Sequence, residues 1–227
     1  RMFRPMMLVR ILEPIAGRPV VRIRLRPTRN FGAEAVCGRA GSHHIVFPVS
    51  ELEYRVTTDA SLSAMADQGP IVVDRPMTFV LGPNQTIEET PSVLAHSLLL
   101  ETSSYWQDWV RTLAIPFDWQ EEVIRAAITL KLCTFEDTGA VLAALTTSIP
   151  EGPGSGRNWD YRYCWLRDSY FVIQALNRLG ATRTMEAYLH FIDHIVAGSA
   201  VHELQPVYSL TGSPDMAERT LASPAGY

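Results

Sequence analysis

The chain has 227 residues, of which 47% are hydrophobic, a size and composition typical of a globular protein with a sizeable core and one large domain or two smaller ones. The formal net charge of -4 gives no overall positive field, so we expect neither nucleic acid nor an acidic membrane surface as a partner. No stretch approaches the roughly twenty apolar residues that a membrane-spanning helix needs.

The cysteines and the first residues bear on where the protein works. Three cysteines, Cys37, Cys133 and Cys164, are few, odd in number and widely spaced, which fits reduced thiols better than a disulfide framework. Residues 6–9 form only a very short apolar run before Arg10, unlike a secretory signal. We therefore expect a cytoplasmic protein. Because residue 1 is Arg, we also expect the chain to have been trimmed or cut from a longer one.

Residues 8–83 predict an all-β region. In residues 21–26 apolar residues and arginines alternate strictly, which is the period of a strand with one buried face. Gly, Pro, Asn, Asp and Ser separate the other apolar runs, as in an antiparallel sheet or sandwich. The further strands that we expect cover residues 44–49, 53–57, 70–74 and 77–81.

Beyond residue 90 the apolar period becomes helical. We expect a helix or helical linker over residues 92–112 and a helix over residues 119–132. Asp118 stands three residues before Glu121, the spacing of a reciprocal cap at a helix start. A later helix ends at Gly180, because glycine just past the last turn is a common stop.

The last expected helix carries one apolar stripe and is closed by Gly198, and residues 206–227 are expected to form a loop. If the helical part of the chain is incomplete, this stripe stays uncovered, and exposed apolar patches cause association. We therefore expect an isolated chain to be poorly soluble or to form a homo-oligomer. The stripe consists of Met185, Tyr188, Leu189, Ile192, Ile195 and Val196.

Residues 156–170, GRNWDYRYCWLRDSY, hold five aromatic residues, three arginines and two aspartates. In one interpretation Asp168 and Ser169 cap the following helix, and the rings pack the loop down. In the other the segment binds carbohydrate, because ring faces suit the C–H surfaces of a sugar. Arg167 and Asp168 would then offer a donor fork beside an acceptor for sugar hydroxyls.

Residues 158–168, NWDYRYCWLRD, preceded by TTSIPE at residues 146–151, resemble the signature of prokaryotic glucoamylase-like proteins of glycoside hydrolase family 15, which also includes some trehalases. The resemblance implies that Arg167 and Asp168 grip the glucose at the non-reducing end. It also implies that Tyr161 and Trp165 line the same pocket.

The resemblance implies a fold in three parts. Residues 1–90 would form an antiparallel, supersandwich-like β-sandwich that lacks its N-terminal part, and residues 91–117 a helical linker. Residues 118–227 would form the first helices of an (α/α)6 barrel, incomplete in this chain. On this basis we expect the chain to be an internal piece of a longer enzyme or a gene remnant.

The activity that the resemblance implies is inverting, exo-acting hydrolysis of α-glucans or maltooligosaccharides with release of glucose; a trehalase acting on trehalose is the alternative. Inversion needs one protonated carboxyl and one carboxylate, which in the family lie on later loops, so we expect no catalytic acid or base in this chain. An alternative from another class is a non-catalytic carbohydrate-binding or remnant module.

Other features do not predict a further site. His43 and His44 would point to opposite faces of a strand, and the pair His190 and His194 lacks the glutamate of a metalloprotease helix, so we expect no metal. The sequence GPGSG at residues 152–156 lacks the Lys-Ser/Thr ending of a phosphate loop. No cofactor motif is present in the sequence, and we expect no cofactor.

Overall fold

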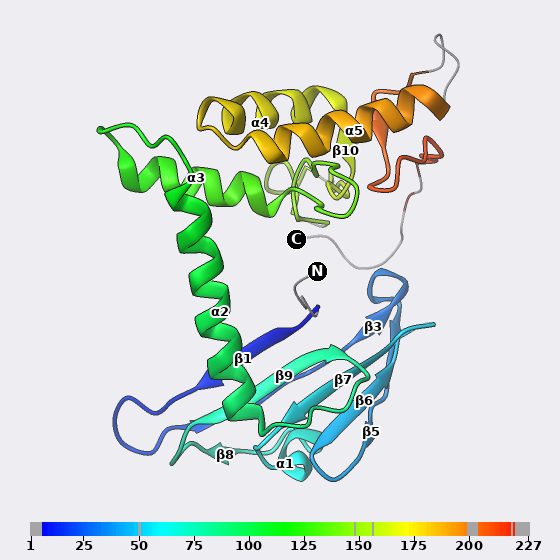
Figure 1. The fold of residues 1–227 in the computed structure, drawn as a ribbon. Coiled ribbons are helices and arrows are strands. Elements are labelled where there is room, and N and C mark those ends of the chain that lie inside the picture. Colours follow the sequence, from blue (N-terminus) through cyan, green and yellow to red (C-terminus); the bar gives the residue numbers. More distant parts are fainter. Residues whose placement is uncertain are drawn as a thin grey trace. The chain divides into compact units, whose positions relative to one another are not determined.

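The computed structural model describes residues 6–49, 51–147, 149–155, 157–198, 204–218 and 220. The chain divides into two compact units, Arg1–Ser103 and Ser104–Tyr227. Figure 1 shows that the first holds most of the strands and the second most of the helices. Each unit has its own hydrophobic core, and each is therefore described by itself.

The first unit is built on a five-stranded antiparallel sheet with the strand order β1-β9-β7-β6-β5. Its central strands bury β-branched and aromatic residues, which pack well on a pleated, half-buried surface. The predicted strands at residues 44–49, 53–57 and 77–81 are confirmed. The strands are β1 (Leu8–Leu12), β5 (Arg39–Ala40), β6 (His44–Pro48), β7 (Glu53–Thr58) and β9 (Met77–Pro83).

The predicted strand at residues 21–26 is only partly correct. Only its first residue belongs to β2 (Val20–Val21), which pairs with β8 (Ile71–Val72). The alternation of burial nevertheless continues through residue 26, because Ile23 and Leu25 pack against the core while the arginines stay in solvent. The apolar period thus identified the buried face, although the ladder stops at Val21, which pairs with Ile71, the first residue of β8.

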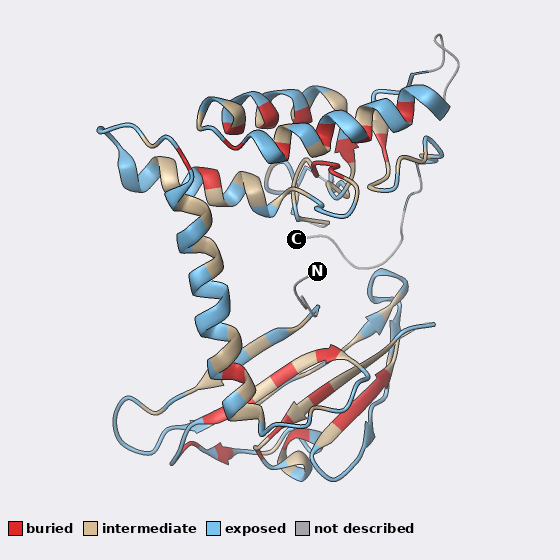
Figure 2. Ribbon diagram, in the orientation of Figure 1, coloured by how far each residue is buried: buried red, intermediate tan, exposed pale blue. Residues whose placement is uncertain are grey.

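The remaining short elements of the first unit were not predicted. They are β3 (Thr28–Arg29), β4 (Glu34–Ala35), the 3-10 turn η1 (Asn30–Gly32) and α1 (Leu62–Ala66). The side chain of Ser61 caps α1 by accepting a hydrogen bond from the backbone N–H of Ala64. Figure 2 shows that buried residues of this unit gather along β6, β7 and β9, where they form its core.

The long helices were largely predicted, with bounds that differ by a few residues. They are α2 (Pro91–Arg111), α3 (Gln120–Leu132), α4 (Leu166–Arg178) and α5 (Thr182–Gly198). Gly180 closes α4 with φ +81, as predicted. Within the described ranges, none of the helices combines the length and hydropathy needed to cross a bilayer.

The predicted cap of α3 is wrong. The residue at the N-cap position is Trp119, which has the left-handed backbone conformation (φ +60, ψ +33) and makes no side-chain cap hydrogen bond. Asp118 therefore stands one residue outside the position from which it could cap. Glu121 and Glu122 lie in the first turn, where their negative charges interact favourably with the positive end of the helix dipole.

The core of the second unit covers most of the apolar stripe of α5. Tyr188 and Ile195 are buried against residues of α4 and of two short strands, β10 (Cys164–Trp165) and β11 (Val207–Tyr208). Leu189 and Val196 remain about half exposed (51% and 49%). The expectation that the whole stripe is uncovered is therefore wrong. The strand β11, in a segment expected to be a loop, also helps to cover it.

Candidate functional site

The aromatic motif begins on a hairpin-like pair of segments. Residues 143–147 and 149–151 run antiparallel to residues 157–163, with an isolated bridge between Pro150 and Asn158. This pairing satisfies backbone groups on both sides of the loop that precedes the motif. The hydrogen bonds are Ala143 N to Tyr163 O (3.0 Å), Ala144 N to Tyr161 O (3.1 Å), Tyr161 N to Thr146 O (3.0 Å) and Glu151 N to Arg157 O (3.1 Å).

The second half of the motif passes through β10 into the first turn of α4. β10 pairs with β11, and the backbone N–H of Leu166 donates to the carbonyl of Pro206 (3.1 Å). Cys164 and Ser169 are fully buried, whereas Trp165 and Arg167 are exposed. The alternation fixes one side of the motif in the core and presents the other side to solvent.

Arg167 and Asp168 form an exposed pair beside an aromatic ring. The Arg167 guanidinium donates to Asp168 Oδ2 from Nε (3.2 Å) and from Nη2 (3.0 Å). The carbon Cζ of Arg167 lies 5.9 Å from the centroid of the Trp165 ring. Three of the four predicted binding residues are thus together, and the Arg167 and Asp168 side chains are 75% and 39% exposed.

The hydrogen-bonding groups that Arg167 and Asp168 leave unused suit a ligand with several hydroxyl groups. Asp168 Oδ1 takes no hydrogen bond from the part of the chain that the structure describes, and a carboxylate oxygen can accept from one or two hydroxyls. The guanidinium of Arg167 keeps donors that Asp168 does not use. A ring, an acceptor and a donor fork on one turn of chain can bind a sugar by its C–H face and its hydroxyls.

The alternative interpretation, in which Asp168 and Ser169 cap α4, is not supported. The N-cap residue is Trp165, and it makes no side-chain cap hydrogen bond. Asp168 lies in the first turn, where its charge favours the helix dipole, but it receives no backbone N–H bond within the described ranges. Its oxygens therefore accept no hydrogen bond from the described backbone at the start of α4.

Tyr161, the fourth predicted residue, lies on the hairpin. Its hydroxyl donates to Glu151 Oε1 at 3.4 Å. Desolvation and the nearby Glu151 carboxylate raise the pKa of Tyr161, so the hydroxyl stays protonated as a donor. Among the described residues, no hydrogen bond or ring contact joins Tyr161 to the Arg167–Asp168 pair. Its part in the same site remains a prediction.

Asp160 is committed to Arg162. The Arg162 side chain donates from Nε to Oδ1 (3.0 Å) and from Nη2 to Oδ2 (2.9 Å), and its backbone N–H also reaches Oδ1 (3.0 Å). The side-chain hydrogen bonds with Arg162 lower the pKa of Asp160. Burial acts in the opposite direction, but the combined effect of the interactions with Arg162 is larger. A carboxyl held ionised in this way cannot serve as a general acid.

Replacing Asp160 with Asn is expected to lower the free energy of unfolding by about 0.5–1 kcal/mol at pH 7, since Arg162 is half exposed and solvent screens the pair. The pKa is lower in the folded state, so the stabilisation is complete above the unfolded pKa of about 3.9 and is lost as pH falls through the folded value. Urea unfolding at pH 7 and pH 3 measures this. An equal loss at both values would contradict it, and Asp193→Asn, at an exposed site, is the control.

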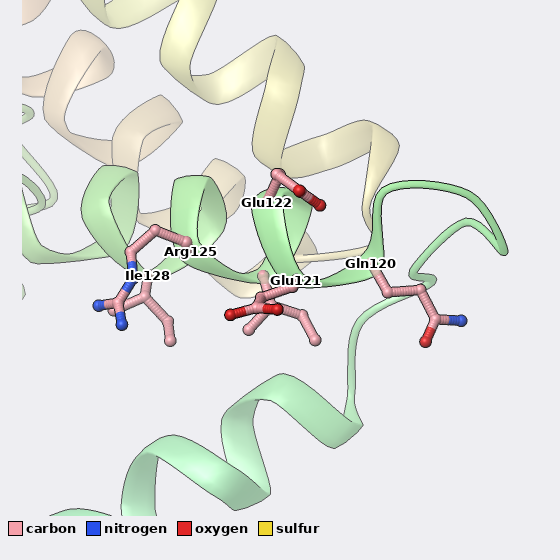
Figure 3. Close-up of a pocket in the computed structure, with 6 residues that line it drawn as sticks. Gln120, Glu121, Glu122, Arg125 and Ile128 are labelled. Carbon is pink, nitrogen blue, oxygen red and sulfur yellow. The ribbon is translucent and has the colours of Figure 1, made fainter.

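A surface depression lies on α3 rather than at the motif. Figure 3 shows Glu121, Arg125 and Ile128 extending from one side of this helix, as their spacing of three to four residues requires. None of the four predicted binding residues lines it. The lining residues are Gln120, Glu121, Glu122, Ile124, Arg125 and Ile128.

His44 lies beside an arginine in the first unit. His44 Nε2 lies 3.0 Å from Arg55 Nη2, and burial, followed by the charges of Arg55 and His43, lowers the pKa of His44. The ring is accordingly neutral at pH 7. In the described residues, no group of three or more His, Cys, Asp or Glu side chains could hold a metal ion.

Comparison with known proteins agrees with the motif. Residues 119–225 match the family model "Glycosyl hydrolases family 15". The resemblance to glycoside hydrolase family 15 is thus confirmed for this part of the chain, which holds α3 to α5 and the whole motif.

Similar curated proteins carry the name trehalase. The chain is 29% identical over 218 residues to a trehalase of Thermoplasma acidophilum, with 93% of this chain and 37% of that protein covered. It is 38% identical over 146 residues to a trehalase of Mycolicibacterium smegmatis, with 63% and 21% covered, and 37% identical over 148 residues to one of Mycobacterium tuberculosis, with 64% and 21% covered. The chain thus spans well under half the length of these relatives. No solved structure is significantly similar to it.

Proposed function

We propose that this chain supplies the glucose-gripping part of an inverting α-glucoside hydrolase of family 15, and that trehalose is the substrate. The observation that carries the proposal is the set of Trp165, Arg167 and Asp168 on one turn of chain, in which Trp165 and Arg167 are exposed and Asp168 is partly exposed. Arg167 and Asp168 bind the hydroxyls of one terminal glucose, and Trp165 supports its C–H face.

Trehalose is favoured over α-glucans by the relatives. The expectation from the sequence alone was a glucoamylase-like enzyme with trehalase as the alternative, whereas the curated relatives described above are named trehalases. A pocket that grips one terminal glucose is compatible with both substrates. The choice therefore depends on the groups that accept the second sugar.

In the reaction that we propose, this site binds the substrate and a pair of carboxyl groups carries out the hydrolysis. One protonated carboxyl gives its proton to the glycosidic oxygen, and a carboxylate activates water on the opposite face of the sugar. Asp160 is excluded as the acid by its lowered pKa. Asp168 is a binding residue, because its carboxylate is paired with Arg167. We assign the acid and base to no residue of this chain.

The finer fold is part of the same proposal. The antiparallel sheet of the first unit supports a β-sandwich over residues 1–90. The packed helices α4 and α5 support the start of an (α/α)6 barrel over residues 118–227. Residues 91–117, which include α2, would form the linker.

The test is a comparison of kcat/KM for trehalose, maltose and maltotriose with the full-length protein. We expect trehalose to give the highest value. A preference for maltotriose would restore the glucoamylase-like interpretation. Binding of these sugars without glucose release would instead identify a non-catalytic carbohydrate-binding module.

A further inference from the structure

The segment that leads into β11 lies beside the turn that carries the proposed glucose-binding residues. β11 pairs with β10 so that Val207 lies opposite Trp165. The pairing continues for one more residue, because the backbone N–H of Leu166 donates to the carbonyl of Pro206 (3.1 Å). Proline has no N–H to return this bond, and the residue that precedes it is Gln205.

This register brings the segment close to the sugar-binding side chains. In an antiparallel ladder, opposed residues that exchange no hydrogen bonds have the closer Cα atoms, about 4.5 Å apart. Trp165 and Val207 form such a pair, since the Leu166 hydrogen bond belongs to the next pair. Arg167 follows Leu166 and Gln205 precedes Pro206, so a single hydrogen-bonded pair separates Arg167 from Gln205.

The backbone of Gln205 is held by a buried hydroxyl. Its N–H donates to the hydroxyl of Tyr208 (2.9 Å), and Tyr208 is 1% exposed and packs with Cys164 in the core of the second unit. Beyond β11, the hydroxyl of Thr138 donates to the carbonyl of Leu210 (2.7 Å). The segment is therefore fixed on both sides of β11, which gives an exposed side chain on it a defined place.

The chemistry of Gln205 suits a sugar. Its side chain is exposed, and a carboxamide carries N–H donors and an acceptor oxygen, which match hydroxyl groups that both give and accept hydrogen bonds. An exposed glutamine is common on protein surfaces and indicates no site by itself. Here the backbone of this glutamine is anchored by a core tyrosine, and its neighbour Pro206 is hydrogen-bonded to the turn that carries Arg167 and Asp168.

We propose that Gln205 is a specificity-determining residue, which binds the second glucose of trehalose while Arg167 and Asp168 hold the first. The inference rests on the proposed function, and it names a group that accepts the second sugar. Tyr208 is a positioning residue in this account, because its hydroxyl holds the backbone that carries the carboxamide.

The test compares two substrates of the full-length protein. Trehalose has a second glucose, whereas α-D-glucosyl fluoride carries a fluoride leaving group in its place. In Gln205→Ala we expect kcat/KM for trehalose to fall about 5- to 30-fold, as for the loss of one or two hydrogen bonds, and kcat/KM for glucosyl fluoride to change less than about 2-fold. Release of glucose and release of fluoride measure the two rates.

Two variants are the controls for this comparison. Gln174 is an exposed glutamine further along α4, and Gln174→Ala should leave kcat/KM for both substrates within about 2-fold of the wild type. Asp168→Ala should lower kcat/KM for both substrates, because it acts on the glucose that they share.

The positioning role of Tyr208 is tested by Tyr208→Phe, which keeps the buried ring and removes the acceptor of the Gln205 N–H. We expect kcat/KM for trehalose to fall about 3- to 10-fold and that for glucosyl fluoride to change less than about 2-fold. In the Gln205→Ala background the same substitution should cause less than about 2-fold further loss, because both changes act through one side chain.

The failure of the inference and the failure of the proposed function give different results. Unchanged kcat/KM for trehalose in Gln205→Ala, or an equal loss for both substrates, would overturn the role of Gln205, whereas losses for both substrates in Asp168→Ala would still support the proposed function. A wild-type protein that hydrolyses neither substrate would remove the proposed function, and the inference with it.

Discussion

Replacing Asp168 with Ala is expected to lower kcat/KM for trehalose about 100- to 1000-fold, because the variant loses charge-assisted hydrogen bonds to glucose hydroxyls worth about 3–4 kcal/mol together. The substitution also leaves the Arg167 guanidinium without the carboxylate that receives its Nε and Nη2 protons. The fork is then free to rotate away from the sugar. Steady-state kinetics of the full-length protein measures the loss.

A matched substitution separates this effect from a general loss of negative charge. Asp193 is an exposed carboxylate on the neighbouring helix α5, and Asp193→Ala should leave kcat/KM within about 2-fold of the wild type. Because the Asp168 side chain is 39% exposed, Asp168→Ala should unfold at nearly the wild-type temperature. Unchanged hydrolysis of trehalose and maltotriose in Asp168→Ala would contradict the role of this residue.

The largest effect on stability is expected at Gly139, which turns the chain beneath α5. Its backbone has φ +84, and a Cβ placed there would lie 2.1 Å from the carbonyl oxygen of Ala187. Gly139→Ala therefore combines the cost of a left-handed residue with a clash against helix backbone, which cannot rotate away. We expect a loss of about 2–5 kcal/mol in the free energy of unfolding, measured by urea denaturation.

Gly180 provides the control for this prediction. It has a similar φ of +81, but a Cβ at this position would meet nothing within 4 Å. Gly180→Ala should therefore show the conformational cost alone, about 1 kcal/mol. Equal losses in the two variants would show that the close approach of Gly139 to Ala187 does not matter.

Periodicity predicted the elements that are long enough to have a period. The strands β7 and β9 and the helices α4 and α5 bury one face along several pleats or turns, and their apolar residues show this period. Two-residue strands such as β10 and β11 are too short to show a period. They form because distant segments supply a partner, which a local pattern cannot show.

The errors at helix starts have a related cause. The spacing of Asp118 and Glu121 is that of a reciprocal cap, but the chain enters α3 through a left-handed Trp119. The sequence gives no sign of that conformation, since non-glycine residues rarely adopt it. At α4 the nearest polar side chains, Asp168 and Ser169, were considered as caps, whereas the cap position belongs to Trp165.

The candidate site was predicted in its chemistry and only partly in its geometry. The proximity of Trp165, Arg167 and Asp168 follows from their spacing along the chain, so the motif was sufficient to find it. The buried hydroxyl of Ser169, by contrast, lies 3.3 Å from the carbonyl of Val141, which is far from it in the sequence. Packing in three dimensions, rather than any local pattern, brings these two residues together.

The most direct test of the central claim is proton NMR of the first glucose that the full-length protein releases from trehalose. Inverting hydrolysis attacks one anomeric carbon and leaves the other untouched, so we predict α- and β-glucose in equal initial amounts. Initial release of α-glucose alone would contradict inversion. A failure to release any glucose from trehalose would contradict the proposed substrate.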